Sequence, residues 1–154
     1  MNIYQPKQYD EKKILDFLKV TNDYFVPHLS ERVNLEEWSK KLYNFAVIFE
    51  QNVNGIVVGL GAMYFNYAPD FSFGAYVCVK KEYQKEMYGV ELIEQMIDYA
   101  KKNGSQGFRG EIRKSNKQMV KFYKLMGLEI VDEISIPSST EIRCIMQKNF
   151  KNDI

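Results

Sequence analysis

The sequence predicts a mixed α/β fold with one central sheet, and three observations carry that prediction. The dipeptide Asn54-Gly55 between two apolar runs is a strong signal for a tight β-hairpin. The expected elements follow the order β-α-α-β-β-β-α-β-α-β-β, which is typical of helices packed on a mixed sheet. One run has the i, i+3, i+4 spacing of a buried helix face: Leu92, Ile93, Met96, Ile97 and Ala100.

The N-terminal third is expected to hold a short strand at 2–4 and two helices. Asp10 is placed to cap the first helix, and Pro27 interrupts the chain after it. Asn34 is placed to cap the second helix, with Glu37 at the capping-box position and Trp38 and Leu42 facing inward. The apolar stripe of the first helix consists of Ile14, Leu15, Phe17 and Leu18.

Three strands should follow, at 45–50, 56–65 and 71–80, because each is an apolar run bounded by turn residues. Gly59 and Gly61 either weaken the second of these strands or mark a bulge in it.

The C-terminal half should begin with a helix that opens near Val90 and stops at Gly104. A strand at 107–113 and a helix at 116–126 come next, and Gly127 ends that helix. Strands at 128–136 and 141–148 should form a final hairpin around the turn Pro137-Ser138-Ser139-Thr140.

Length and composition indicate one soluble domain spanning 1–154, since 45% of the residues are hydrophobic and 27% are charged. The net charge of +1 favours neither a nucleic-acid partner nor an acidic membrane surface. The N-terminal residues lack the apolar core of a signal peptide, so a cytoplasmic location is expected. Cys78 and Cys144 have no metal-ligand spacing, and we expect two buried free thiols and no metal.

Three features could carry chemistry, and each has an ordinary structural alternative. The polar turn at 84–89 joins a strand to a helix N-terminus, where free N–H groups bind phosphates, but every α/β protein has such junctions. Glu111 alternates with Arg109 and Arg113, so it is either a general base or part of a charged ladder on a solvated face. Tyr123 lies on a helix face with Met119, Phe122 and Met126, so it is either a core residue or a proton donor.

These segments together resemble the GCN5-related N-acetyltransferase (GNAT) family. The quoted stretches are Tyr83-Gln84-Lys85-Glu86-Met87-Tyr88-Gly89-Val90, then Glu111-Ile112-Arg113-Lys114-Ser115-Asn116, then Phe122-Tyr123-Lys124-Leu125-Met126-Gly127-Leu128. They look like the family's Gln/Arg-x-x-Gly-x-Gly/Ala, Glu-x-x-x-x-Asn and Phe-Tyr-x-x-x-Gly-Phe motifs. The resemblance spans nearly the whole chain, and the spacing from Asn116 through Tyr123 to Gly127 is its most specific part.

The resemblance implies a mostly antiparallel, splayed sheet of six or seven strands with about four flanking helices. It also implies acetyl-CoA as co-substrate, with direct transfer of the acetyl group to an amine. In this reading Glu111 is the general base, Tyr123 protonates the departing thiolate, and Asn116 contacts the cofactor arm. The splayed strand end that would pair with the pantetheine arm is Val77, Cys78 and Val79. The turn that would hold the pyrophosphate is Gln84, Lys85, Glu86, Met87, Tyr88, Gly89 and Val90.

Met87 departs from the family pattern because it occupies the place of the motif's first glycine. A side chain in a left-handed conformation there costs on the order of 1–2 kcal/mol. Either the turn keeps a right-handed path with Met87 pointing outward, or the site has degenerated into a non-catalytic acyl-CoA-binding or regulatory module. We favour the first alternative because the other motif residues remain.

The acceptor side is less readable from the sequence. It should be bounded by the loop 24–34, the second helix and 66–70, and its mixed polar and aromatic character suits a small polar amine such as an amino sugar or polyamine. A peptide N-terminus is the alternative. The final hairpin also has an exposed edge through which a homodimer is conceivable. The residues expected to contact the acceptor are Tyr24, His28, Arg32, Tyr67 and Asp70.

Overall fold

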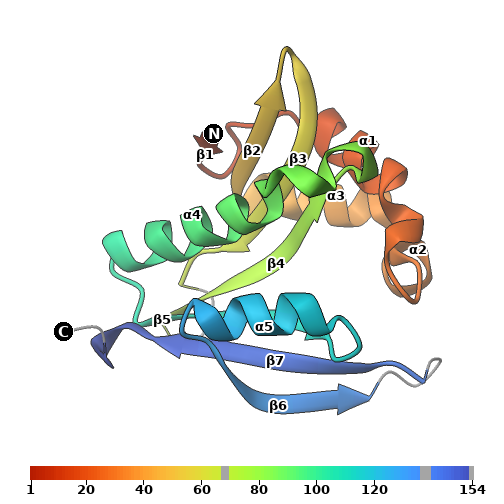
Figure 1. Cartoon of the computed structure of the whole chain (residues 1–154). Helices are drawn as coiled ribbons and strands as arrows, with labels where there is room; N and C mark the ends of the chain where they lie inside the picture. Colours follow the sequence, from red (N-terminus) through yellow and green to blue (C-terminus); the bar gives the residue numbers. More distant parts are fainter. Residues whose placement is uncertain (67–69, 136–139, 153–154) are drawn as a thin grey trace.

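The chain folds around one seven-stranded sheet with helices on both faces, as a computed structural model shows for residues 1–66, 70–135 and 140–152 (Figure 1). The strands are β1 (Asn2–Tyr4), β2 (Val47–Val53), β3 (Ile56–Tyr64), β4 (Phe71–Val79), β5 (Gly107–Arg113), β6 (Glu129–Ser135) and β7 (Ile142–Asn149). The α-helices are α1 (Glu11–Val20), α2 (Leu29–Arg32), α3 (Leu35–Phe45), α4 (Tyr88–Lys102) and α5 (Lys117–Leu125). Short 3-10 helices are η1 (Asn22–Tyr24), η2 (Lys81–Glu86) and η3 (Phe150–Asn152). The predicted mixed α/β class and element order are confirmed.

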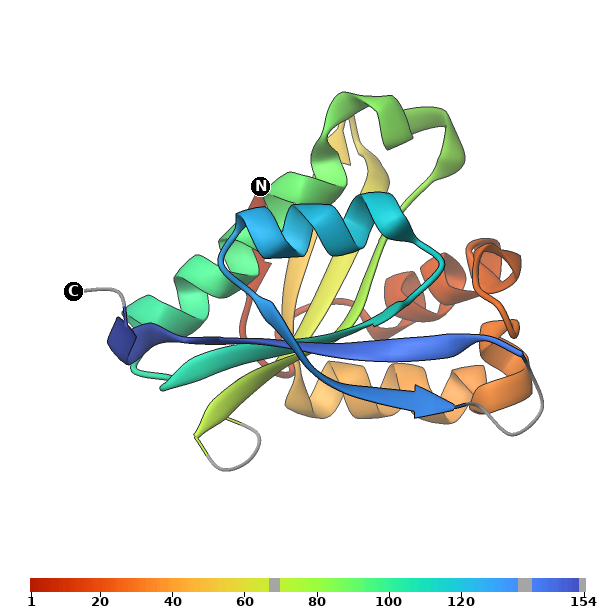
Figure 2. The same cartoon turned by 60° about the horizontal axis from the view of Figure 1, so that its bottom comes forward.

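The strands lie in the order β1-β2-β3-β4-β5-β7-β6, and every neighbouring pair is antiparallel except β4 and β5. The parallel pairing of β4 with β5 runs only from Phe71 opposite Gly107 to Gly74 opposite Gly110. Beyond Gly74 the two strands diverge, as Figures 1 and 2 show. The predicted splay of the sheet is therefore present, and it opens toward the C-terminal ends of both strands.

Two hydrophobic cores cover the two faces of the sheet. Helices α4 and α5 cover one face, where residues such as Met96 and Tyr123 pack with Phe49 and Phe108. Helices α1, α2 and α3 cover the other face. The buried helix residues on that second face are Ile14, Phe17, Leu18, Leu29 and Leu42. Both faces of the sheet are thus covered by apolar residues. The sheet that separates the two cores is interrupted where β4 diverges from β5.

The predicted helix caps are present. The Asp10 side chain accepts hydrogen bonds from the N–H groups of Lys12 and Lys13, and the Asn34 side chain accepts one from the Glu37 N–H. Such bonds satisfy N–H groups that the first turn of a helix cannot pair internally. The Asn54-Gly55 turn has positive φ at both residues, 52° and 83°, as a type I′ hairpin requires.

Several predicted boundaries were displaced. Phe45 ends α3 rather than opening a strand, and β2 begins at Val47. Helix α4 begins at Tyr88, before the predicted Val90. The expected polar turn 84–89 is divided between the end of the 3-10 helix η2, the N-cap Met87 and the start of α4. Helix α2 lies within the segment 24–34, which was expected to be a loop. The helix was missed because four residues are too few to show a helical period.

Gly59 and Gly61 allow α4 to lie close to β3. A Cβ atom on Gly59 would lie 3.1 Å from Leu92 Cδ1, and one on Gly61 would lie 3.0 Å from Met96 Sδ. A register shift occurs between Gln51 and Asn52, next to Gly59 on the partner strand. The predicted bulge is therefore present, and close helix packing is a second reason for the glycines.

Two sequence-based predictions lie partly outside the described residues: the acceptor residue Tyr67, and the 136–139 part of the final hairpin. None of the helices within the described ranges is both long and apolar enough to cross a membrane.

Candidate active site

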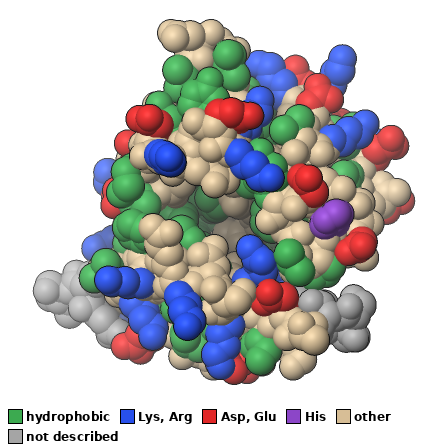
Figure 3. Space-filling model, turned by 45° about the vertical axis from the view of Figure 1, so that its right-hand side comes forward, with side chains coloured by type: hydrophobic (Ala, Val, Ile, Leu, Met, Phe, Trp, Pro, Cys, Tyr) green, Lys and Arg blue, Asp and Glu red, His purple; other side chains and the backbone are tan. Residues whose placement is uncertain are grey.

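A cavity of about 920 Å³ opens where β4 and β5 separate. Figure 3 shows it as a hollow near the centre of one face of the molecule, with Lys and Arg side chains near its rim. The lining comes from both faces of the sheet, because it includes Tyr123 of α5 as well as Arg32 of α2 and Trp38 of α3. The divergence of the two strands therefore creates a passage between the two cores.

The exposed edge of β4 presents peptide groups to this cavity. The Lys80 N–H donates to Val58 O on β3, 2.8 Å away, so alternation along the strand turns the peptide groups of Val77 and Val79 toward the side that β5 has left. Gln84 Nε2 donates to Val79 O at 3.0 Å, which occupies one of these groups. The remaining groups are available to an extended ligand that adds to the strand edge.

Met87 adopts the left-handed conformation, with φ 63° and ψ 14°, and its side chain is 53% exposed. Of the two alternatives predicted from the sequence, a right-handed path at this residue is wrong, and the exposed Met87 is one of the residues that line the cavity. The turn therefore keeps the backbone shape that a glycine would favour, at a conformational cost.

The N-terminus of α4 faces the cavity without a side-chain cap. Met87 is the N-cap residue and makes no capping hydrogen bond, and Gly89 and Val90 line the cavity. The first N–H groups of a helix have no intrahelical partner, and the helix dipole adds partial positive charge there. This end of a 15-residue helix is suited to an anionic group.

The predicted turn residues divide into two groups. Gln84, Met87, Gly89 and Val90 line the cavity, whereas Lys85, Glu86 and Tyr88 do not. The Glu86 side chain is exposed and is outside the cavity lining. Tyr88 instead packs near Tyr83, with ring centroids 6.5 Å apart.

Tyr123 lies against the strand where the sheet opens. A Cβ atom on Gly110 would lie 3.5 Å from Tyr123 Cε2 and 3.7 Å from its hydroxyl oxygen. The side chain is 7% exposed, and burial raises the pKa of the Tyr123 phenol to about 12. The hydroxyl is therefore protonated at neutral pH and carries a proton that it can donate.

Asn116 lines the cavity and also caps α5. Its Oδ1 accepts a hydrogen bond from the Met119 N–H at 3.3 Å, so the oxygen is used by the helix. The amide Nδ2 remains the polar atom that can donate to a ligand. The predicted position of Asn116 beside the cofactor arm is compatible with this geometry.

Glu111 lies on the α2 side of the sheet and contacts two arginines. Its Oε1 is 3.8 Å from Arg32 Nη2 and 3.5 Å from Arg143 Nε, and the Glu111 side chain is 25% exposed. Both distances exceed those of a good hydrogen bond, about 2.7–3.2 Å. The predicted alternation of Arg109, Glu111 and Arg113 on one face is present, but Glu111 lines a cavity and is not on an open solvated surface.

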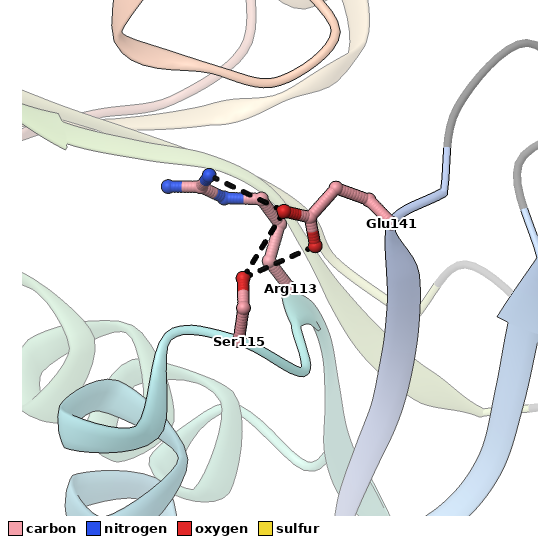
Figure 4. Close-up of polar contacts among 3 residues, drawn as sticks. All are labelled: Arg113, Ser115 and Glu141. Carbon is pink, nitrogen blue, oxygen red and sulfur yellow. Dashed lines mark hydrogen bonds and ion pairs between the residues drawn. The ribbon is translucent and has the colours of Figure 1, made fainter.

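A third arginine is held at the rim by a neighbouring carboxylate (Figure 4). Arg113 Nη1 lies 4.0 Å from Glu141 Oε1, and the Ser115 hydroxyl donates to both oxygens of Glu141 at 3.2 and 3.1 Å. Arg113 also faces Arg143 directly across β5 and β7. The α2 side of the cavity thus gathers three guanidinium groups around two carboxylates.

The residues predicted to contact the acceptor are not all at the cavity. Tyr24 and Arg32 line it, and the Tyr24 hydroxyl accepts a hydrogen bond from the Lys81 N–H at 3.1 Å. His28 is exposed and is outside the lining. Asp70 precedes the end of β4 that pairs with β5, so it lies at the closed end of the split and is also outside the lining.

Sequence reasoning missed Lys81, Trp38 and Arg143 as cavity residues. One signal for Arg143 was available, because it is the only charged residue in the apolar run 142–146. A charge in such a strand needs a polar partner or a ligand. Lys81 and Trp38 gave no comparable signal, since a surface lysine and a helix-face tryptophan have common structural roles.

The two cysteines differ from the predicted pair of buried thiols, because Cys144 is buried but Cys78 is only half-buried. Cys78 and Cys144 are free thiols, and burial raises the pKa of the Cys78 thiol, which lines the cavity, to about 11. Within the described residues, no three His, Cys, Asp or Glu side chains come together as a metal site.

Comparison with known families decides how this geometry is to be interpreted. A model of the acetyltransferase (GNAT) family matches residues 12–128 of the sequence. The chain belongs to the GNAT family. As a member of this family, the GNAT protein is an acetyl-CoA-dependent acyltransferase. The family membership that its motifs predicted is confirmed. A search of curated proteins finds no match.

Solved structures share the fold of this GNAT protein at low sequence identity. The ribosomal-protein-alanine N-acetyltransferase of Brucella melitensis has a TM-score of 0.75 at 18% identity, over 97% of this chain and 99% of that one. The ribosomal-protein-S18-alanine N-acetyltransferase of Escherichia coli has a TM-score of 0.73 at 16% identity, over 96% and 92%. The yncA protein of Salmonella typhimurium, solved with its cofactor acetyl-CoA, has a TM-score of 0.69 at 16% identity, over 97% and 93%.

Proposed function

We propose that this GNAT protein transfers the acetyl group of acetyl-CoA directly to a primary amine of a small polar acceptor, with both substrates bound at once. The observation that carries the proposal is the cavity that passes through the sheet at the separation of β4 and β5. Tyr123 reaches it from the α5 face, and Glu111 reaches it from the α2 face. Two substrates can therefore meet there from opposite sides.

Three features of the chain fit acetyl-CoA. The peptide groups of Val77 and Val79 offer a strand edge to the pantetheine arm, and the uncapped N-terminus of α4 at Gly89 and Val90 offers N–H groups to the pyrophosphate. Asn116 Nδ2 is a further donor at the cavity. When bound, acetyl-CoA supplies the acetyl group as a thioester and leaves as a thiol.

The two candidate catalytic residues would handle the protons. Glu111 would accept the proton that the amine loses as its bond to the acetyl carbon forms. Tyr123, whose pKa is raised by burial, would donate its proton to the sulfur as the carbon–sulfur bond breaks. Arg32 and Arg143 compete with an ammonium group for the same Glu111 oxygen, so amine binding would loosen those two ion pairs.

A thiol-release assay tests the proposal. Purified protein is given acetyl-CoA with a panel of small amines and, separately, with short peptides bearing free N-termini. Release of CoA that depends on a small amine, with the N-acetylated product seen by mass spectrometry, supports it. Acetylation of peptides alone would overturn the small-molecule acceptor and favour an activity like that named for the Brucella and Escherichia proteins.

The sequence also left open a non-catalytic module that binds acyl-CoA. The left-handed backbone at Met87 and the uncapped N-terminus of α4 support retained cofactor binding, but they do not distinguish the two functions. Calorimetry with acetyl-CoA and with CoA, combined with the amine panel, does so. Binding of acetyl-CoA without thiol release in the presence of any amine or peptide would favour the module.

A further inference from the structure

We infer that the acceptor is an amino acid whose free carboxylate is bound by Arg143, with Arg32 and Arg113 beside it. This inference rests on the proposed function and names the class of acceptor that the α2 side of the cavity selects. It follows from the state of Arg143, from the arrangement of charges around it, and from the distance between Arg143 and Glu111.

Arg143 is a buried cation with unused hydrogen-bond donors. Its side chain is 8% exposed, and the buried Nε and Nη2 atoms have no hydrogen-bond partner among the described residues. A buried donor left unsatisfied is costly, and a guanidinium offers five N–H groups that match a carboxylate in a two-pronged geometry. Arg143 lines the cavity, so a ligand in the cavity can supply the missing acceptors.

The surrounding charges also favour an anion. Arg143 faces Arg113 directly across β5 and β7, and like charges in that position repel each other. Burial and then repulsion from Arg32 lower the pKa of Arg143. Among the described residues, five cationic and two acidic side chains line the cavity, and Glu141, which contacts Arg113, is outside that lining. A polyamine would be repelled here, whereas a carboxylate would be attracted.

The distances place the anion close to the amine. Glu111 Oε1, the proposed acceptor of the amine proton, lies only 3.5 Å from Arg143 Nε and 3.8 Å from Arg32 Nη2. A ligand with its amine at Glu111 must therefore have its anionic group only a few bonds away. An amino acid meets that condition, and a peptide N-terminus does not, because its neighbouring carbonyl is an uncharged amide.

The rest of the wall indicates an apolar side chain on this amino acid. Aromatic residues from the segment after η1, from α3 and from the central strands line the cavity together with the arginines. They include Phe25, Trp38, Tyr64 and Phe73. Phenylalanine is therefore a suitable probe, with phenylalanine amide and phenethylamine as the matched compounds that lack the carboxylate.

The test compares kcat/KM for these three amines. Phenylalanine should be preferred over its amide by roughly 10- to 100-fold, the size expected for hydrogen bonds to a charged group. The difference in amine pKa favours the amide, because the ammonium group of phenylalanine amide loses its proton more readily than that of phenylalanine. A preference for phenylalanine would therefore have to overcome this difference. An amide or phenethylamine that is acetylated as fast as phenylalanine would overturn the inference and leave the proposed function standing.

Variants then locate the carboxylate. Arg143→Gln should bring the preference for phenylalanine over its amide close to one, and Arg32→Gln, at a more exposed position, should reduce it partly. Arg109→Gln is the matched control, since Arg109 lies on the same face of β5 but donates to Gln147 and is outside the cavity lining. Calorimetry should give all three variants the wild-type affinity for acetyl-CoA, which shows that they are folded.

Three results count against the inference. Equal loss of preference in Arg109→Gln and Arg32→Gln would show a general effect of charge. Acetylation confined to peptides would identify a different class of acceptor. Bound acetyl-CoA with no thiol release for any amine would defeat the proposed function itself, and with it this inference.

Discussion

Glu111 and Tyr123 approach the opening between β4 and β5 from opposite faces of the sheet. Glu111 contacts Arg32 of α2, whereas Tyr123 packs with the core under α4 and lies against Gly110. Adjacent residues of a strand point to opposite faces. Strand β5 therefore faces Tyr123 at Gly110, whereas the Glu111 side chain lies on the other face, at the opposite side of the same passage. This arrangement separates the proposed proton acceptor, Glu111, from the proposed proton donor, Tyr123.

We expect Glu111→Gln to reduce turnover more than Tyr123→Phe. An alkyl amine with a pKa of about 10.4 is neutral in only about one molecule in 10³ at pH 7, which opposes the reaction by roughly 4–5 kcal/mol. A thiol has a pKa near 8.5, so its thiolate needs a proton less urgently. Steady-state thiol release should fall by about 10²–10⁴-fold in Glu111→Gln and by less in Tyr123→Phe.

A carboxylate on the exposed strand β6 provides the control. Glu129→Gln removes the same charge far from the cavity and should keep wild-type turnover. If Glu111→Gln also turned over at the wild-type rate, Glu111 would not be the base, and a water chain would have to carry the proton.

Tyr123 should also give the fold a characteristic dependence on alkaline pH. Burial raises the pKa of Tyr123 from 10 to about 12, so its stabilising contribution is complete below pH 10 and is lost as the pH rises toward 12. The loss amounts to on the order of 2–3 kcal/mol of the free energy of unfolding. Urea unfolding at about pH 9 and about pH 11.5 should show a smaller decrease for Tyr123→Phe than for the wild type.

Other buried tyrosines contribute to the same range, so the two proteins must be compared by their pH slopes. Tyr76 also has a raised pKa, chiefly through burial, and it is present in both proteins. Identical slopes for wild type and Tyr123→Phe would contradict the raised pKa of Tyr123.

Replacing Met87 with glycine should stabilise the protein. Met87 has φ 63°, and relief of the left-handed conformation is worth about 1–2 kcal/mol. The greater freedom of glycine in the unfolded chain offsets about 0.5–1 kcal/mol of that gain. Urea unfolding should therefore show a net increase of about 0.5–1 kcal/mol.

The matched variant Met87→Ala removes the side chain but keeps the Cβ atom. It should show no such gain, because the conformational cost belongs to any residue with a Cβ. Equal stabilisation by alanine and glycine would mean that the exposed Met87 side chain, and not its backbone, carries the cost.

Alanine at Gly89 should separate folding from cofactor binding. The nearest atom to a Cβ there is Val79 Cγ2 at 3.7 Å, an ordinary contact, so the fold should be unchanged or more stable by up to about 1 kcal/mol. If the pyrophosphate approaches the N-terminus of α4 closely, the added methyl should weaken acetyl-CoA binding in calorimetry. Unchanged affinity would place the pyrophosphate elsewhere.

Gly107→Ala, in contrast to Gly89→Ala, should destabilise the fold. A Cβ atom on Gly107 would overlap with the backbone oxygen of Lys148 and would lie only 2.5 Å from Phe71 Cε2, well inside the van der Waals contact distance. Overpacking of this kind costs about 1–3 kcal/mol or more, and backbone atoms cannot easily move aside. Thermal unfolding should show a clear loss of stability, which Gly89→Ala does not share.

Much of the fold could be predicted because its signals are local. Asp10 and Asn34 cap helices through their own side chains, and the Asn54-Gly55 turn needs only two residues that accept positive φ. The boundary at Phe45 was misplaced for the same reason, since an apolar residue fits either a helix end or a strand start. Helix α2 and η2 were missed because short helices leave no periodic pattern.

The candidate site was predicted only in part. Glu111, Asn116 and Tyr123 could be identified through the resemblance of their segments to the GNAT motifs, and all three line the cavity. Arg143 lies more than thirty residues along the chain from Glu111, and only the pairing of β5 with β7 brings them together.

The sequence was sufficient for the main element order, the caps and the hairpin turn, because each depends on neighbours within a few positions, and its resemblance to the GNAT motifs identified the motif residues. Tertiary structure alone decided that β4 leaves β5 after Gly74 and Gly110 and that Met87 is left-handed. It also decided that Arg32 and Arg143 converge on Glu111. Those features depend on contacts between distant segments, where strand pairing and burial outweigh local preference.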